Sequence, residues 1–88
     1  MKTPHLKNAV ILRDGEEVWF GEAIIPDEDA KRRFLGMSLL ATASRIADDL
    51  KGTPKYIHGQ DKVEIYRDDK VVTTLTLELR EPLDPERN

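Results

Sequence analysis

Side chains that could carry out catalysis are few in this sequence and lie far apart. There is no cysteine, so no thiolate is available as a nucleophile or a metal ligand. The two histidines, His5 and His58, are far from each other, and neither stands at a metal-ligand spacing from another candidate ligand. Ser38 and Ser44 have no histidine or lysine partner at helical spacing that would activate them. We therefore predict no catalytic residues and expect that the chain is not an enzyme.

Nine of the 17 acidic residues form three pairs and one triplet where turns and helix ends are expected: Glu16-Glu17, Asp27-Glu28-Asp29, Asp48-Asp49 and Asp68-Asp69. Carboxylates that act in hydrolysis converge in a cleft, whereas turns and helix ends are solvated. The spacing of an EF-hand calcium loop is absent, and so are both glycine-rich phosphate-binding motifs. These patterns predict no metal site and no cofactor.

Composition narrows the class of protein further. The chain has 88 residues, enough for one small domain, with 35% charged residues and a net charge of −3. Nucleic acid is an unexpected partner, because its binding usually needs a basic excess. No apolar run approaches the roughly 20 residues of a membrane span, and the first residues lack the apolar core of a signal peptide. We expect a cytoplasmic protein.

The pattern around the middle of the chain predicts one long helix, from about residue 27 to 51. Pro26 and Asp27 form a typical helix start, and Lys51-Gly52 a typical helix end. Projected at about 100° per residue, the helix has a core-facing stripe centred on Leu35, Leu39, Ile46 and Leu50.

Extended segments flank this helix. The run from Asn8 to Ile25 predicts a hairpin with its turn at Asp14-Gly15, and Gly21 marks a bulge or a close backbone approach. A weak strand near residues 55–58, a strand at 62–67 and a clearly alternating strand at 70–80 follow the helix. The order β-β-α-β-β-β with short turns predicts an α+β two-layer sandwich, with the helix packed on a mostly antiparallel sheet. We expect residues 1–80 to form this domain and residues 81–88 to form a disordered, charged, proline-rich tail.

The helix carries more apolar surface than one small sheet requires. A second set, Ala30, Phe34, Met37 and Ala41, lies partly behind the core stripe. This set either tucks against a loop or meets a second copy of the chain. Trp19 on the hairpin is either a packing residue at the core's edge or an exposed contact residue. The sequence thus predicts an interface formed by Trp19, Ala30, Phe34, Met37 and Ala41.

The segment from Asn8 to Leu50 resembles the core of the roadblock/LC7 family, which has a profilin-like sheet. The points of likeness are the hairpin NAVILRDGEEVWFGEAI and the long helix FLGMSLLATASRIADDL, followed by further strands. The resemblance implies a homodimeric scaffold, or a regulator of small GTPases, without catalysis of its own. The family normally has a helix before the first strand and often one after the last, and this sequence predicts neither.

These observations favour a non-enzymatic protein-interaction or regulatory module that self-associates, in the simplest case as a homodimer. The alternative is a domain that binds a small ligand or nucleic acid on the open face of its sheet. That face would present Tyr66, Thr74, Thr76 and Arg80.

Overall fold

The computed structural model describes residues 5–81, and the expected α+β order is confirmed. A hairpin of β1 (Leu6–Arg13) and β2 (Glu16–Ile24) precedes the helical segment. The helical segment runs through α1 (Glu28–Leu35), a π-helical stretch η1 (Gly36–Leu40) and α2 (Ala41–Leu50). Three strands follow: β3 (Thr53–Ile57), β4 (Lys62–Arg67) and β5 (Lys70–Arg80). Of the predicted tail at 81–88, only Glu81 lies within the described residues.

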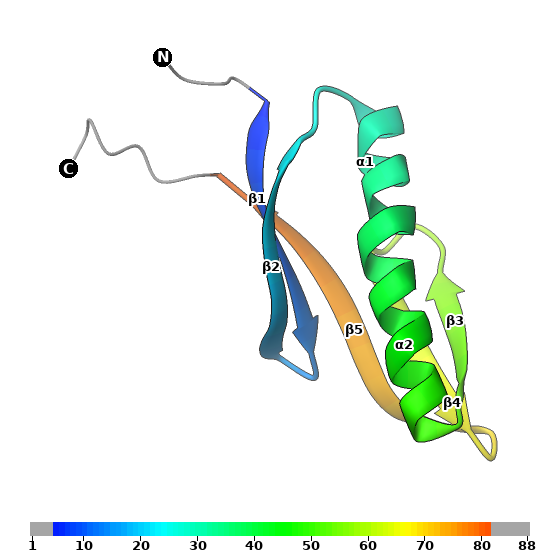
Figure 1. The fold of residues 1–88 in the computed structure, drawn as a ribbon. Helices are drawn as coiled ribbons and strands as arrows, with labels where there is room; N and C mark the ends of the chain where they lie inside the picture. Colours follow the sequence, from blue (N-terminus) through cyan, green and yellow to red (C-terminus); the bar gives the residue numbers. More distant parts are fainter. Residues whose placement is uncertain (1–4, 82–88) are drawn as a thin grey trace.

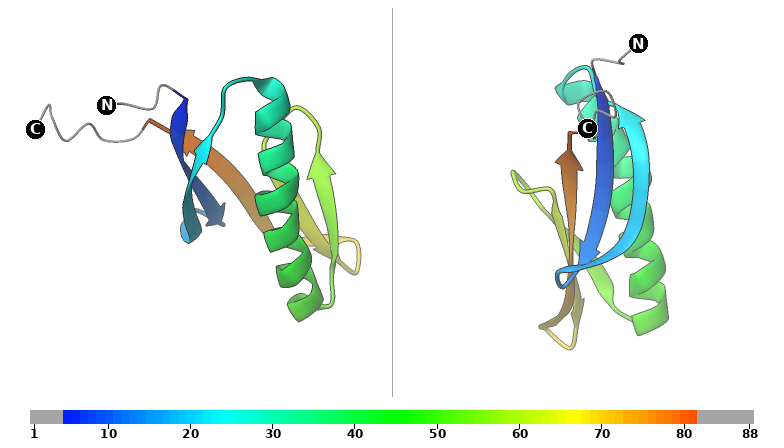
Figure 2. Two further views of the ribbon diagram at one scale, coloured as in Figure 1. Left: turned by 45° about the horizontal axis from the view of Figure 1, so that its top comes forward. Right: turned by 90° about the vertical axis from the view of Figure 1, so that its left-hand side faces the viewer.

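All five strands join one sheet in the order β2-β1-β5-β4-β3, and every neighbouring pair is antiparallel. The helix connects the two edge strands and packs over β3, β4 and β5 (Figure 1). The β1–β2 hairpin extends to one side of it, and a view along the sheet shows the helix on one face only (Figure 2). The sandwich therefore has two layers, and its helical layer covers the sheet unevenly.

The core lies between the helix and the middle of the sheet. Leu39 and Ala43 are fully buried, as are Ile11, Val63 and Leu75 on the strands. In β5 the alternation expected from the sequence places Thr73, Leu75 and Leu77 inward. Val71, at the start of that strand, is exposed, because Val72 is an extra residue that shifts the register against β4.

The helix begins and ends close to the predicted residues. The Asp27 side chain accepts a hydrogen bond from the Ala30 amide at 2.9 Å, as an N-cap should. At the other end the left-handed residue is Lys51, with φ of 56°. The Gly52 amide donates to the Ala47 carbonyl at 2.8 Å, so Lys51-Gly52 ends the helix as predicted. Gly52 has a second role as well, since a Cβ there would lie 2.8 Å from both Ile65 and the Tyr66 carbonyl oxygen. Glycine is needed at 52 so that the chain can pass close to β4.

The π-helical stretch was not predicted, and the spacing of the buried residues accounts for it. The core positions Leu35, Leu39, Ala43 and Ala47 recur every four residues. On a regular α-helix each such step drifts by about 40° around the axis. The wider π turn at Gly36–Leu40 corrects part of this drift and keeps the stripe facing the sheet. The Ser38 hydroxyl donates to the Phe34 carbonyl at 2.6 Å within this stretch.

The turn between β1 and β2 is fastened to the middle of β5. Asp14 adopts a left-handed φ of 49°, and its carboxylate accepts hydrogen bonds from the Thr73 hydroxyl at 2.6 Å and the Thr74 amide at 3.0 Å. The Asp14 amide in turn donates to the Thr74 carbonyl at 2.9 Å. Arg13 donates to the same Thr73 hydroxyl oxygen at 3.1 Å. Thr73 is buried with its hydroxyl satisfied, so this cluster holds the far end of the hairpin against the sheet.

The Asp14 cluster predicts a pH-dependent stability. The bond from Thr73, followed by the bond from Thr74, holds the pKa of Asp14 below its ordinary value of 3.8. The carboxylate therefore stabilises the fold fully above pH 3.8, and this contribution is lost as pH falls through the lowered pKa. We expect Asp14→Asn, which tolerates the left-handed turn, to melt at a lower temperature than the wild type at pH 7. The difference should shrink in thermal melts as pH falls from 4 to 2.5, and a constant difference would contradict this role.

Candidate functional site

Four of the five residues predicted to form an interface meet in one groove between the helix and β2. The groove has a volume of about 320 Å³ and is lined by Trp19, Phe34, Met37, Ser38, Ala41, Thr42 and Arg45. It exists because β2 and the helix diverge, leaving the Trp19 side chain to bridge the space. The Trp19 and Phe34 rings contact each other, with centroids 6.0 Å apart and planes inclined by 51°. Trp19 is half-buried and packs at the core's edge, which was one of its two predicted environments, and it also lines the groove. Its role as a contact residue stays a prediction.

The fifth predicted residue, Ala30, lies elsewhere. It is half-buried in the first turn of α1, where its amide serves the Asp27 cap, and it does not line the groove. Three residues that line the groove, Ser38, Thr42 and Arg45, were not predicted. Ser38, Thr42 and Arg45 are spaced by four and three residues on the same side of the helix as Phe34. This spacing is the feature of the sequence that could have identified them.

Trp19 has its position because residue 21 is a glycine. Both residues point toward the helix side of the sheet, and a Cβ at position 21 would lie 2.4 Å from the indole Cη2 atom. The close approach predicted at Gly21 is therefore made by a side chain of the same strand. The bulge is located at Val18, which has no partner in β1 between the pairs Ile11–Trp19 and Leu12–Glu17.

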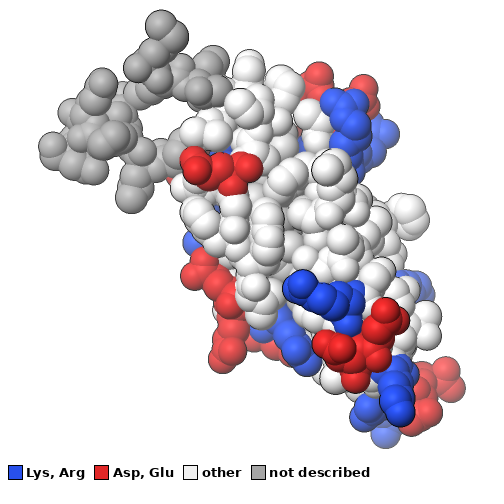
Figure 3. Space-filling model, viewed as in Figure 1, with Lys and Arg blue, Asp and Glu red and all other residues white. Residues whose placement is uncertain are grey.

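Beside the groove, the outward surface of the helix carries no charge over three turns. The segment Phe34–Ser44 contains no ionisable residue. Within it Met37 is 79% exposed and Leu40 is 38% exposed, and Ala41 and Ser44 are exposed as well. Figure 3 shows this uncharged surface across the middle of the molecule, between a group of charges at the beginning of the helix and another toward its end. A solvated helix face normally carries charged side chains, so this surface has the composition of a contact surface.

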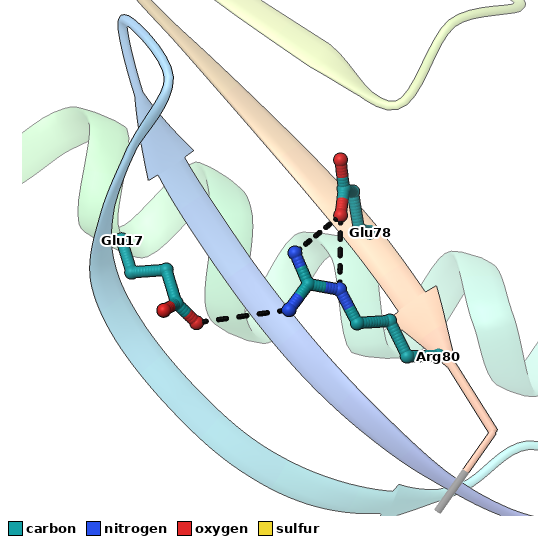
Figure 4. A network of polar contacts seen from close by, with 3 residues as sticks. All are labelled: Glu17, Glu78 and Arg80. Carbon is teal, nitrogen blue, oxygen red and sulfur yellow. Dashed lines mark hydrogen bonds and ion pairs between the residues drawn. The ribbon is translucent and has the colours of Figure 1, made fainter.

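The opposite face of the sheet has different chemistry. The residues predicted there, Thr74, Thr76 and Arg80, alternate with the buried residues of β5 and so point away from the helix. The Arg80 guanidinium binds Glu78 at 2.7 Å and lies 3.8 Å from Glu17, so that it bridges two strands across β1 (Figure 4). Because Arg80 stands opposite Asn8 and Glu17 opposite Leu12, the bridge crosses β1 at the level of the buried Val10.

The remaining polar residue predicted on the open face is also engaged. The Tyr66 hydroxyl donates to Glu64 at 3.0 Å, and this bond raises the pKa of Tyr66 above its ordinary value of 10.0. With Arg80 paired to two carboxylates, the predicted open-face residues leave little free positive charge for a phosphate or other anion.

Residues 5–81 contain neither a cluster of metal-binding side chains nor a membrane-spanning helix. Within that range no group of three or more histidine, aspartate or glutamate side chains is arranged to hold a metal ion. His58 packs edge-on against Tyr56, with ring centroids 5.2 Å apart. No helix within the same range is both long enough and apolar enough to cross a bilayer.

Comparisons with known proteins give no relative: no family model, no curated protein and no solved structure matches the chain significantly.

The contact between Trp19 and Gly21 predicts the effect of a single methyl group. In Gly21→Ala the new Cβ would displace the indole from the strand and from Phe34. We expect a loss of about 1–3 kcal/mol in the free energy of unfolding, together with a shift in the emission of this single tryptophan. The emission shift and the denaturant midpoint measure the two effects separately.

Gly36→Ala is the matched control, because a Cβ at position 36 meets no atom within 4 Å. This variant should keep the native tryptophan emission and be as stable as the wild type or more stable, since alanine favours helix over glycine by about 1 kcal/mol. An unchanged emission in Gly21→Ala would contradict the packing described.

Proposed function

We propose that this chain is a non-enzymatic interaction module that forms a homodimer through the outward surface of its helix. The observation that carries the proposal is the arrangement of charge on that surface. An exposed and uncharged centre, formed by Met37, Leu40, Ala41 and Ser44, has arginines at the N-terminal end and aspartates at the C-terminal end. A surface with opposite charges at its two ends is complementary to itself when two copies run antiparallel.

The register of such a pair follows from the sequence. A two-fold axis between Leu40 and Ala41 places Met37 opposite Ser44 of the partner helix. The same axis places Arg33 opposite Asp48 and Arg32 opposite Asp49. Arg33, Met37, Leu40, Ser44 and Asp48 are spaced by three or four residues, so they share one side of the helix and can all contact a partner helix. The charges at the two ends of the contact then have partners of opposite sign, whereas the exposed Arg45 lies opposite Gly36.

The small side chains in this surface suit close packing of two helices. Ala41 and Ser44 leave a depression into which the long and flexible side chain of a facing Met37 could fit. The adjoining groove adds the apolar side chains of Trp19 and Phe34 on one side, together with Arg45 at its rim. Burial of Met37 alone is worth about 1.5–3 kcal/mol. These features support a contact that an isolated and thinly packed small domain would gain from.

The alternative, a domain that binds a small ligand or nucleic acid on the open sheet face, is less well supported because Arg80 and Tyr66 are engaged by neighbouring carboxylates. The likeness to the roadblock/LC7 family is also kept as a proposal. It agrees with a homodimer, but the dimer proposed here depends on the helix surface alone. A role toward small GTPases remains an expectation from that resemblance.

Charge reversal tests the proposed homodimer. Arg33→Glu places a glutamate against Asp48 of the partner at each of the two symmetric contacts, and Asp48→Arg places an arginine against Arg33 at each of them. We expect each single variant to weaken the dimer about tenfold or more, since each changes two symmetric contacts from attraction to repulsion. An equimolar mixture of the two variants should form a heterodimer in which both contacts are again attractive. Sedimentation equilibrium at low salt measures all three association constants.

Glu16→Arg makes the same change of charge as Asp48→Arg but at the exposed start of β2, and it should leave the dimer unchanged. Wild-type protein that stays monomeric at millimolar concentration would exclude the homodimer altogether. A dimer that forms but ignores both reversals would exclude this register while leaving self-association in place.

A further inference from the structure

The two edges of the sheet differ in how they are protected against pairing with another strand. The β3 edge is five residues long, contains Pro54 and Lys55, and is packed by the end of the helix. The β2 edge is nine residues long, has neither proline nor lysine, and is irregular only at Val18. Proteins usually protect an exposed edge with short strands, prolines, lysines or bulges. From Trp19 to Ile24 the β2 edge has none of these devices, and its one charged side chain is Glu22.

The hydrogen-bonding groups on this edge can be assigned to residues. Ile25 donates its amide proton to the His5 carbonyl at 2.8 Å, so residue 25 faces β1. In an antiparallel pair, residues that bond the neighbouring strand alternate with residues whose N–H and C=O groups point away. The backbone groups of Trp19, Gly21 and Ala23 therefore face β1. Those of Phe20, Glu22 and Ile24 point out from the free edge.

The same three residues have exposed side chains on the sheet face away from the helix. Phe20 is 60% exposed and Ile24 is 57% exposed, while Glu22 lies between them and is also exposed. An apolar–acidic–apolar row of side chains thus accompanies a row of free backbone groups. Among the described residues, Glu22 forms no ion pair.

A second copy of β2 does not suit this edge. The strand carries Glu16, Glu17 and Glu22 and no basic residue, and the only ion pair it forms in the described structure is the 3.8 Å approach of Arg80 to Glu17. Antiparallel self-pairing centred on Phe20 would bring Glu22 diagonally beside Glu16 of the other copy. Like charges at close cross-strand positions are destabilising. The negative charge of the β2 edge therefore disfavours pairing with a second copy of β2 and favours pairing with a positively charged strand.

From this geometry we infer that the β2 edge is a docking site for an extended peptide segment of another protein, with a basic side chain between two apolar ones at alternate positions. The segment would add a sixth strand beside β2 and exchange hydrogen bonds with Phe20, Glu22 and Ile24. Its lysine or arginine would face Glu22, and its apolar side chains would face Phe20 and Ile24. The pattern is the same in both directions, so the pairing could be parallel or antiparallel. This site is separate from the helix surface and does not depend on the proposed dimer.

Amide hydrogen exchange tests the inference with a defined probe. The probe is an acetylated and amidated peptide, Thr-Val-Thr-Lys-Thr-Val-Thr, and the control peptide has glutamate in place of its lysine. In the free protein the amides of Phe20, Glu22 and Ile24 should exchange rapidly, while those of Trp19, Gly21 and Ala23 exchange slowly. The lysine peptide should slow the exchange of the first three amides at least tenfold at saturation. Slow exchange in the free protein, or no protection at millimolar peptide, would overturn the inference.

Charge reversal at Glu22 tests the specificity. The wild-type protein should bind the lysine peptide about five- to tenfold more tightly than the glutamate peptide, because one attractive cross-strand contact replaces one repulsive contact. Glu22→Lys should reverse this preference. Asp69→Lys, which makes the same change of charge in the exposed turn between β4 and β5, should keep it. Equal affinity of the wild-type protein for both peptides, or the same loss in Asp69→Lys, would overturn the role of Glu22.

Discussion

The arrangement of this molecule depends on a difference in width between its two layers. Five strands spaced about 4.8 Å apart span roughly 20 Å from edge to edge, whereas a helix with its side chains is only about 10 Å wide. A single helix therefore covers about half of the sheet. Its core stripe, led by Leu39 and Ala43, packs on β3, β4 and β5 and shares one core with Ala9 and Ile11 of β1, whereas β2 contacts the helix through Trp19. Trp19 is the one large side chain of β2 that extends toward the helix. The space beside it, between β2 and the helix, is the groove.

Much of the fold could be predicted because local patterns specify it. The Asp27 cap, the Asp14-Gly15 turn and the alternation of Thr73, Leu75 and Leu77 depend on neighbouring residues, and the structure confirms each of them. The π-helical stretch escaped prediction because it reconciles a four-residue spacing with a sheet whose position was unknown. The strand order was equally inaccessible. Only when β1 is known to pair with β5 does β2 become a free edge, and only then does Phe20 become an exposed residue on that edge.

The residues of the predicted interface could be found from local patterns, but their arrangement in space could not. Phe34, Met37 and Ala41 were found from helical periodicity, and Trp19 from an excess of apolar residues on the hairpin. That these four residues meet was not contained in any local pattern, since it requires the connection between Ile24 and Glu28 to bring the helix back over the sheet. Ala30 shared the periodicity of the others but lies beyond the groove. Periodicity predicts on which side of the helix a residue lies. Which residues on that side line the groove depends on how far β2 extends along the helix.

Charge distinguishes the two exposed surfaces more sharply than hydrophobicity does. The helix surface has arginines near one end and aspartates near the other, and the two-fold axis of the proposed dimer would place these opposite charges against each other. The β2 edge carries one sign only, and the same symmetry operation turns it into repulsion. If both proposals hold, the homodimer presents two equivalent β2 edges, because a closed two-fold assembly repeats every surface that it does not bury. A partner with two basic–apolar segments could then engage both edges, and its second contact would form at the effective concentration set by its linker. Weak pairing at each edge would thereby give stable binding only to partners that carry the motif twice.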